Sequence, residues 1–259
     1  MPIPIFQVDA FAGEVFQGNP AAVCPLDHWL PDNRLQAIAA ENNLAETAYF
    51  VRKDGAYELR WFTPTQEIDL CGHATLASAF VIFHFLDPRA TEVTFLSKSG
   101  PLVVRRDGEL LALDFPSRPP KRCEPPTGLE AALGKRPLET WRARDHMAVF
   151  ASEEEVRALR PRMERLLEID AHAFIATAPG RQADFVSRFF APAVGVPEDP
   201  VTGSAHCTLI PYWAERLGKN RLRALQVSSR GGELVCELRG DRVIIAGRAA
   251  LFLEGTIRV

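Results

Sequence analysis

The stretch EDPVTGSAHC, from Glu198 to Cys207, has an earlier counterpart in EIDLCGHATL, from Glu67 to Leu76. In each copy a glycine, Gly72 or Gly203, follows the first acidic residue by five positions and opens an apolar run with the composition of a helix. Because one acid–loop–glycine phrase occurs twice, we asked whether its surroundings are repeated as well.

The surroundings do match. RWF at residues 60–62 precedes the first copy, and RFF at 188–190 precedes the second. SKSGPLV at residues 97–103 follows the first copy, and SRGGELV at 229–235 follows the second. Three matching segments in the same order, about half a chain apart, predict two structurally similar halves.

Each half is predicted to contain one long apolar helix and several strands. Residues 73–86 are apolar nearly all round, which indicates a buried central helix. Its counterpart is expected over residues 203–218, with Pro211 inside and Gly218 at the end. Two further helices are expected at residues 31–43, with Asp32 as the N-cap, and at 153–167. Alternating or β-branched runs predict strands at residues 3–11, 47–53, 57–64, 91–115, 172–180, 183–192 and 243–259.

A proline-rich segment at residues 115–128 separates the two halves and is typical of a linker. We therefore expect an N-terminal lobe of residues 1–117 and a C-terminal lobe of residues 118–259, with a final strand that can cross back to the N-terminal lobe.

Composition argues against several classes of protein. A net charge of −3, with no long basic stretch, argues against a nucleic-acid partner. The longest apolar run, LASAFVIFHFL, is too short to span a bilayer, and we expect no signal peptide and no membrane partner. Five scattered cysteines without a CxxC motif indicate reduced thiols in the cytoplasm. No dinucleotide-binding or Walker motif predicts a cofactor.

The repeated glycines, Gly72 and Gly203, fall in the first turn of the two predicted central helices. The first N–H groups of a helix have no partner within it, and the helix dipole adds partial positive charge there. Two such N-termini facing each other would hold a small carboxylate substrate, although ordinary helix starts without a ligand remain the alternative.

Candidate acid–base residues lie near both helix starts. Glu46 has apolar neighbours, as a general base in a water-poor site does, although a solvated carboxylate is the plainer interpretation. Asp199 precedes Pro200 and is otherwise a loop or capping residue. His73 follows Gly72 directly and is otherwise a core histidine, and His206, deeper in its helix, is expected to be structural.

Three other chemistries fit less well. A serine hydrolase would use Ser204 with Asp199 and a histidine, but TGSAH lacks the G-x-S-x-G elbow. A metal site from Cys71, His73, His206 and Cys207 lacks the usual ligand spacing, so no metal is expected. A two-thiol racemase needs a cysteine at both helix starts. Cys71 is so placed, but Cys207 lies inside its helix, which leaves open a single Cys71 acting with a carboxylate.

The chain resembles the PhzF-like (phenazine-biosynthesis-like) isomerase family along nearly its whole length. The resemblance is carried by VDAFAGEVFQGNPAAV, NLAETAYF, RWFTPTQEIDLCGHATLA, PEDPVTGSAHC and SSRGGEL. It implies an α+β, diaminopimelate-epimerase-like fold in which each lobe wraps a barrel-like, mostly antiparallel sheet around a central helix. It further implies an active site in the cleft between the lobes, a homodimer, and cofactor-free proton transfer, as in biosynthesis of phenazines.

The resemblance also implies roles for individual residues. The family's catalytic glutamate maps to Glu46, its supporting residues map to His73, Asp199 and Ser204, and its helix starts map to Gly72 and Gly203. Cys71 departs from the small residue of the phenazine enzyme and matches the catalytic cysteine of related epimerases.

We therefore expect an isomerase that moves a proton on a small carboxylate-bearing molecule, with Glu46, His73 and Asp199 catalytic and with Gly72, Gly203, Ser204 and Cys71 binding substrate. A Cys71-thiol-based epimerase or racemase and a non-catalytic small-molecule-binding member of the family are the alternatives.

Overall fold

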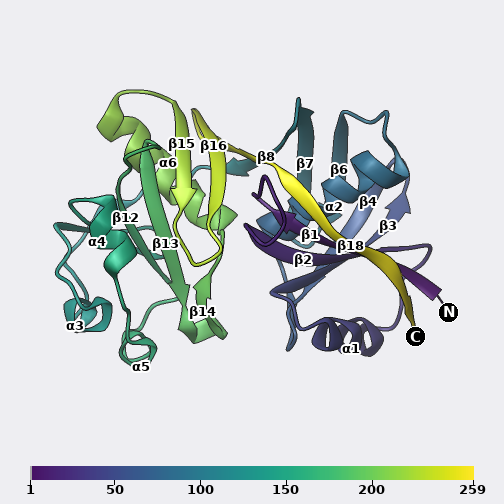
Figure 1. The fold of residues 1–259 in the computed structure, drawn as a ribbon, viewed down its shortest axis with the longest axis horizontal. Coiled ribbons are helices and arrows are strands. Elements are labelled where there is room, and N and C mark those ends of the chain that lie inside the picture. The colour runs from purple at the N-terminus through teal and green to yellow at the C-terminus, as the bar shows by residue number, and fades with distance from the viewer. Residues whose placement is uncertain (1) are drawn as a thin grey trace. The chain divides into compact units, whose positions relative to one another are not determined.

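The computed structural model describes residues 2–259 as a mixed α+β protein that consists mostly of sheet (Figure 1). The chain forms two compact units. One runs from the N-terminal segment to Phe115 and takes in Ala246–Val259, and the other comprises Pro116–Ile245. Within residues 2–259, none of the helices has both the length and the apolar character needed to cross a membrane.

The first unit is a sheet that packs against helix α2. Its C-terminal strand β18 pairs antiparallel with β1 along nearly the whole length of both strands. The elements are β1 (Pro2–Ala10), β2 (Asn19–Leu26), α1 (Asp32–Asn42), β3 (Glu46–Lys53), β4 (Ala56–Phe62), β5 (Glu67–Ile68), α2 (Gly72–Val81), a π-helical turn η1 (Ile82–Leu86), β6 (Glu92–Ser97), β7 (Gly100–Asp107), β8 (Leu110–Pro116) and β18 (Ala249–Arg258).

The second unit is built in the same order around helix α6. Its elements are β9 (Lys121–Arg122), α3 (Leu129–Leu133), β10 (Glu139–Arg142), β11 (His146–Val149), α4 (Glu153–Ala158), α5 (Met163–Leu166), β12 (Phe174–Pro179), β13 (Phe185–Ala191), a 3-10 turn η2 (Pro192–Val194), β14 (Val196–Asp199), α6 (Gly203–Leu217), β15 (Arg221–Gln226), β16 (Gly232–Arg239) and β17 (Arg242–Gly247).

Strand pairing confirms the internal repeat that the sequence predicts. In the first unit β2 and β3 are parallel, β3 and β4 antiparallel, β4 and β6 parallel, and β6 and β7 antiparallel. The second unit repeats this pattern with β11 and β12, β12 and β13, β13 and β15, and β15 and β16. The central helix lies at the same place in both patterns, between β4 and β6 or between β13 and β15.

Both central helices are buried, as their apolar sequences predict. In α2 every residue is buried except Gly72 and Phe80, which are partly buried. The helix packs against β1, β2 and β3. In α6, Pro211 lies inside the helix, and Gly218 ends it with a left-handed φ of 65°, a conformation that glycine adopts without steric cost.

An arginine–glutamate pair precedes the central helix of the first unit. Arg60 on β4 donates from Nε and Nη2 to the two carboxylate oxygens of Glu67 on β5, at 2.7 and 2.9 Å. Its Nη1 donates to Asp32 at the start of α1, and its guanidinium lies over the ring of Phe62. The Arg60 side chain thus links strand β4 to Glu67, the first residue of the repeated segment, and to the start of helix α1.

The second unit has the same pair. Arg188 on β13 donates from Nε and Nη2 to Glu198 on β14, again at 2.7 and 2.9 Å. Its Nη1 donates to the carbonyl oxygens of Val156 and Leu159 at the end of α4, and its guanidinium lies over the ring of Phe190. Two-point pairing of this kind fixes the angle between the groups as well as their distance.

Two helix predictions are wrong in detail. Asp32 is the first residue of α1 and not its N-cap, which is Pro31, because the Asp32 carboxylate accepts a hydrogen bond from Arg60 instead. Residues 153–167 form two short helices, α4 and α5, and not one. Pro161 lies between them, has no N–H to donate, and disfavours helical backbone at the residue before it.

The Arg60–Glu67 pair predicts a stability difference that depends on pH. Hydrogen bonds from Arg60 lower the pKa of Glu67 from about 4.5 to about 2, with Lys98 contributing in the same direction. A lowered folded-state pKa stabilises the fold above the unfolded value and loses that contribution as pH falls through the folded value. Glu67→Gln should therefore lower the unfolding free energy at pH 7 by about 1–2 kcal/mol.

Urea unfolding from pH 7 down to pH 2 measures this difference, which should shrink steadily below about pH 4.5. Glu92→Gln is the matched control because Glu92 pairs with Arg105 through side chains that are each about half exposed, and an exposed pair contributes little. Equal effects of the two substitutions at pH 7 would contradict a special role for the Arg60–Glu67 pair.

Candidate functional site

In the first unit, Glu46 and His73 are in direct contact. Glu46 is the first residue of β3 and His73 is the second residue of α2. Oε2 of Glu46 lies 2.9 Å from Nε2 of His73, and the side chains are 14% and 6% exposed. The sequence thus singled out a carboxylate and an imidazole that the fold brings together across 27 residues.

Asn19, which the sequence analysis did not single out, holds the other side of the imidazole. Its Nδ2 lies 3.1 Å from Nδ1 of His73, and Asn19 is fully buried. Gly18 before it has a φ of 64°, and a Cβ there would lie 2.1 Å from the carbonyl oxygen of Ala10. Glycine is therefore required in the turn that delivers Asn19 to the site. When His73 is neutral, this contact leaves its proton on Nε2, facing Glu46.

Cys71 caps the start of α2 and completes the cluster. Its Sγ lies 3.5 Å from Nδ1 of His73, and the residue is buried. Burial raises the pKa of the Cys71 thiol, and the charge of Glu46 acts in the same direction. The side chain is therefore a neutral thiol near neutral pH.

The electrostatic balance at His73 favours the protonated ring. Burial lowers the pKa of His73, but the interactions with Cys71 and Glu46 outweigh burial and raise this pKa well above its usual value. Since the Cys71 thiol is itself neutral, Glu46 is the charge that stabilises the imidazolium. The raised pKa of His73 stabilises the folded protein. This stabilisation is complete below the unfolded-state histidine pKa of about 6.5 and is lost as pH rises through the pKa of His73 in the folded protein.

The same three side chains are a possible ligand set. One donor atom each from Glu46, Cys71 and His73 lie within 4.8 Å of one another. A metal would have to replace the direct Glu46–His73 contact and deprotonate a thiol whose pKa is raised. The absence of a metal from the working site stays a prediction.

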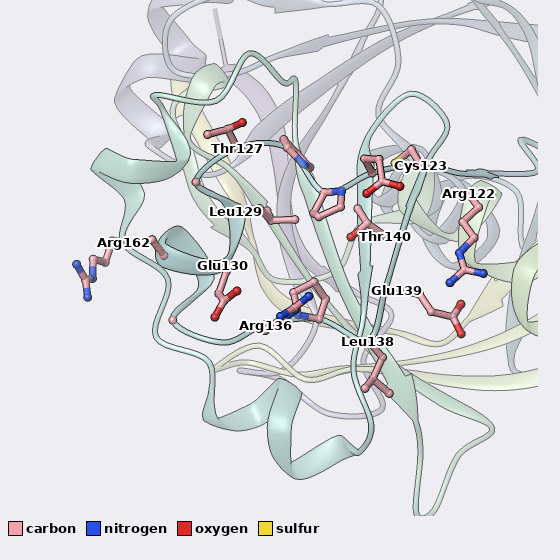
Figure 2. Close-up of a pocket in the computed structure, with 17 residues that line it drawn as sticks. Arg122, Cys123, Thr127, Leu129, Glu130, Arg136, Leu138, Glu139, Thr140 and Arg162 are labelled. Carbon is pink, nitrogen blue, oxygen red and sulfur yellow. The ribbon is translucent and has the colours of Figure 1, made fainter.

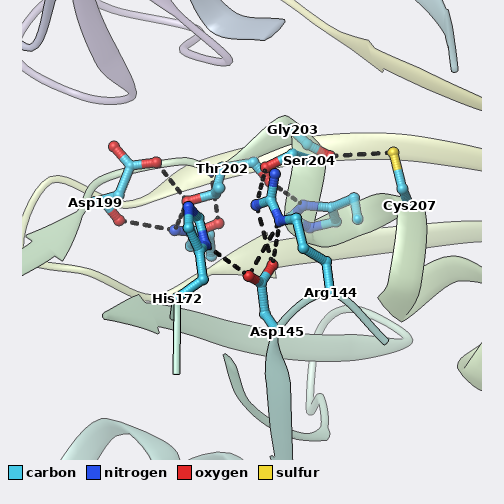
Figure 3. A network of polar contacts seen from close by, with 10 residues as sticks. Arg144, Asp145, His172, Asp199, Thr202, Gly203, Ser204 and Cys207 are labelled. Atoms are coloured by element: carbon cyan, nitrogen blue, oxygen red, sulfur yellow. Dashed lines mark hydrogen bonds and ion pairs between the residues drawn. The ribbon is translucent and has the colours of Figure 1, made fainter. Parts of the chain in front are cut away.

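In the second unit, Asp199 ends β14 and is held by the residues before α6 (Figure 3). Thr202 Oγ1 donates to Asp199 Oδ2 at 2.5 Å, and Gln226 Nε2 donates to the Asp199 carbonyl oxygen at 2.8 Å. The backbone N–H of Thr202 donates to Gln226 Oε1. This closed set of hydrogen bonds fixes the loop that leads into Gly203 and Ser204.

Ser204, the second residue of α6, occupies the place that His73 has in α2. Its Oγ accepts a hydrogen bond of 3.2 Å from Nη2 of Arg144, whose guanidinium pairs with the buried carboxylate of Asp145. The sequence analysis did not identify Arg144 or Asp145, because the segment RARDHM at residues 142–147 has the composition of an ordinary polar turn.

The residues of a serine hydrolase are not assembled in this unit. His206 is fully buried, and its Nδ1 contacts the carbonyl oxygen of Thr202 at 2.9 Å. Burial lowers the pKa of His206 to about 4 and raises that of Cys207 to about 11. The burial of His206 agrees with the expectation of a structural role, and Ser204 has no histidine partner within the second unit.

A cavity of about 970 Å³ lies elsewhere in the second unit, around the Pro-rich segment, α3 and β10 (Figure 2). Among its lining residues are Arg122, Cys123 and Arg136. It contains none of the residues that the sequence proposed for catalysis or binding.

Comparisons with known proteins agree along the whole chain. Residues 8–255 match the family described as phenazine biosynthesis-like protein. An uncharacterized isomerase of Pseudomonas aeruginosa is 54% identical over 259 residues, covering 100% of both chains. The crystal structure of a PhzF-family phenazine biosynthesis protein from Enterococcus faecalis matches with a TM-score of 0.98 at 49% identity, again over 100% of both chains.

A more distant match shows the breadth of the fold. A hydroxyproline epimerase from Agrobacterium vitis, solved with bound trans-4-hydroxy-L-proline, has a TM-score of 0.61 at 10% identity, covering 99% of this chain and 92% of its own. At this identity the match supports the fold alone. The expected diaminopimelate-epimerase-like architecture is confirmed.

The contact between Asn19 and His73 predicts the tautomer of His73. In the wild type, at a pH above the His73 pKa, long-range ¹H–¹⁵N correlation spectra should show the proton on Nε2. In Asn19→Leu, which removes the amide at similar size, the Nδ1–H tautomer should become populated. Loss of a buried hydrogen bond should also lower the unfolding free energy by about 1–3 kcal/mol.

Asn42→Ala is the matched control because it removes an asparagine of the same unit whose Nδ2 bonds Thr47 and not His73. An unchanged His73 tautomer in Asn19→Leu would show that Asn19 does not orient the ring.

Proposed function

Because the chain belongs to the phenazine biosynthesis-like (PhzF) family and is an isomerase, we propose that it moves a proton on a small carboxylate-bearing substrate by general acid–base catalysis. The observation that carries this proposal is the buried contact between Glu46 and His73, with Asn19 on the opposite ring nitrogen. A carboxylate and an imidazole in contact out of water can pass a proton between them without loss to solvent.

Glu46 is the proposed base. Its carboxylate takes a proton from a substrate carbon, and the electron pair of the broken C–H bond moves into the substrate's adjacent unsaturated group. The proton then returns to a different carbon, directly or through His73, so that the substrate is isomerised with no net gain or loss of atoms. Nε2 of His73 stabilises the Glu46 carboxylate before the first transfer and again after the proton has been returned.

The second unit is proposed to bind the substrate's carboxylate. Ser204 and the free backbone N–H groups at the start of α6, from Gly203 onward, suit an anion, and Gly72 at the start of α2 is the matching element of the first unit. Asp199, fixed by Thr202 and Gln226, is proposed to relay or steer protons. Donors placed in this way around developing charge contribute about 10²–10³-fold to rate.

Cys71 supports a second candidate, a thiol-based epimerase. The observation in its favour is the 3.5 Å distance between Sγ and Nδ1 of His73, since a neutral imidazole at this distance can accept a thiol proton on Nδ1. The raised pKa of the thiol counts against it. We therefore place Cys71 in the substrate-binding wall and Glu46 at the reacting carbon.

We further propose that the protein works without a cofactor, in the cytoplasm and as a homodimer. Support for a reducing compartment comes from its cysteines, all five of which are free thiols and four of which are buried.

Glu46→Gln should lower turnover by about 10²–10⁴-fold, the range for loss of a positioned base. The assay is deuterium incorporation from D₂O at carbon, followed by NMR across a panel of small unsaturated and 2-substituted carboxylates. Glu41→Gln is the matched control because Glu41 is an exposed glutamate on the neighbouring α1. Exchange at the wild-type rate in Glu46→Gln would remove Glu46 from the mechanism.

Cys71→Ser separates the two candidates in the same assay. With Glu46 as the base, the serine variant should keep its turnover within about tenfold, because only a wall residue changes. A thiol mechanism would lose several orders of magnitude, because a serine hydroxyl is a far weaker acid than a thiol.

A further inference from the structure

The hairpin between β10 and β11 brings an arginine to the start of α6. Arg144 and Asp145 lie in this turn, between Arg142 and His146, which are the last paired residues of the two strands. Nη2 of Arg144 donates to Ser204 Oγ at 3.2 Å, across 60 residues of sequence. Figure 3 shows the guanidinium lying between Asp145 and Ser204.

Asp145 fixes one edge of this guanidinium. Its carboxylate is 2% exposed and accepts hydrogen bonds from Nε at 3.1 Å and from Nη2 at 3.0 Å. The other side of the carboxylate is held by Nδ1 of His172, at 2.8 Å from Oδ1. A two-point contact to a buried, doubly held carboxylate leaves the guanidinium little freedom to turn.

The arrangement leaves two donors without a partner. A guanidinium can donate but cannot accept, so Ser204 Oγ must be the acceptor of its contact with Arg144, and the Ser204 O–H remains available to donate. Within residues 2–259 neither this hydroxyl hydrogen nor Nη1 of Arg144 has a hydrogen-bond acceptor. The Arg144 side chain is 37% exposed, so a ligand can reach it.

The first unit uses the matching hairpin in the same way. The turn between β1 and β2 delivers Asn19 to His73, the second residue of α2. The turn between β10 and β11 delivers Arg144 to Ser204, the second residue of α6. Since the two units share one topology, the hairpin position is where each unit sets the hydrogen-bonding state of the residue at its helix start.

We propose that Arg144 is a specificity-determining residue that, with Ser204, binds one carboxylate group of the substrate through Nη1–H and the Ser204 O–H. The inference rests on the proposed function and adds which residues recognise the carboxylate. Asp145 already balances the charge of Arg144, so the pair carries little net positive charge. This balance suits a singly charged carboxylate better than a doubly charged phosphate.

Benzoate, its neutral isostere benzamide, and inorganic phosphate are the probes. Their binding to the full-length protein is measured by ligand-observed NMR titration at fixed pH and ionic strength. The wild type should bind benzoate at least tenfold more tightly than benzamide, and phosphate more weakly than benzoate. Arg144→Gln should weaken benzoate binding by about 10–100-fold, the range for one charged hydrogen-bonding partner, and leave benzamide binding unchanged.

Arg144→Lys is the second variant, chosen in case Arg144→Gln fails to fold. It keeps a cation beside the buried Asp145 but cannot make the two-point hydrogen bonding of a guanidinium. It should retain a cooperative thermal transition and bind benzoate more weakly than the wild type. Arg122→Gln is the matched control and should not affect benzoate binding, because Arg122 is an exposed arginine of the same unit on β9. Equal affinity of the wild type for benzoate and benzamide, or unchanged benzoate affinity in both Arg144 variants, overturns the proposal, as does tighter binding of phosphate than of benzoate.

Glu46→Gln separates this inference from the proposed function. The variant should bind benzoate like the wild type, since Glu46 belongs to the base and not to the carboxylate contact. If no carboxylate in the panel exchanges deuterium but benzoate binding still depends on Arg144, the catalytic proposal fails and the recognition of a carboxylate stands. If deuterium exchange occurs and depends on Glu46, but Arg144→Gln leaves the KM of the exchanging substrate unchanged, the catalytic proposal stands and the role of Arg144 in carboxylate recognition fails.

Discussion

The two-point pairing of an arginine with a glutamate, made once in each unit, is the constraint on which the placement of both helix starts depends. In each unit one guanidinium holds the acidic strand with Nε and Nη2 and a crossing helix with Nη1. A charge that is mostly removed from water is tolerated only when its hydrogen-bonding groups are satisfied, so the three contacts are interdependent. The loop that follows each glutamate is therefore anchored at its beginning, and the buried central helix anchors its end. Because both ends are fixed, the short loop between them can adopt few backbone conformations.

Upon this shared framework the two units have diverged in chemistry. The second residue of α2 is a histidine, 6% exposed at its side chain, facing a carboxylate. The equivalent residue of α6 is a serine, partly exposed and facing an arginine. The first environment brings a carboxylate and an imidazole together with little water, whereas the second presents side-chain donors that a ligand can reach. A repeated scaffold explains why His73 and Ser204 occupy the same structural position, the second residue of the central helix in each unit.

The sequence predicted the fold well because its evidence is periodic and repeated. Apolar helices, alternating strands and three matched segments each extend over many residues. The errors include a proline-broken helix, the cap at Asp32, and the strands β2, β10, β11 and β15, which no predicted strand covered. The sequence singled out Glu46, His73, Asp199 and Ser204 as candidates through their signature blocks but did not single out Asn19, Arg144, Asp145 or Gln226. Asn19, Arg144 and Gln226 act across sequence separations of 54, 60 and 24 residues, and Asp145 acts by holding its neighbour Arg144. No local pattern encodes such a contact, because it depends on how the hairpin turns meet the helix starts. The Gly-Asn pair at residues 18 and 19 was the one available signal, since a left-handed glycine beside a buried amide is typical of a turn with a positional role.

The surroundings of Cys71 bear on whether this cysteine or Glu46 is the base in the proposed reaction. The imidazole of His73 already faces the carboxylate of Glu46 at 2.9 Å, and one imidazolium can balance one negative charge. A thiolate at Cys71 would place a second anion on the same ring in a site with little water, where like charges repel strongly. The thiol therefore keeps its proton as long as Glu46 is charged. The Cys71 thiol would be freer to ionise in two cases. In the first, a substrate draws the proton of His73 away from Glu46, and in the second, Glu46 itself is protonated during the proposed reaction. The direct contact between His73 and Glu46 therefore supports the proposal that Glu46, and not Cys71, is the base.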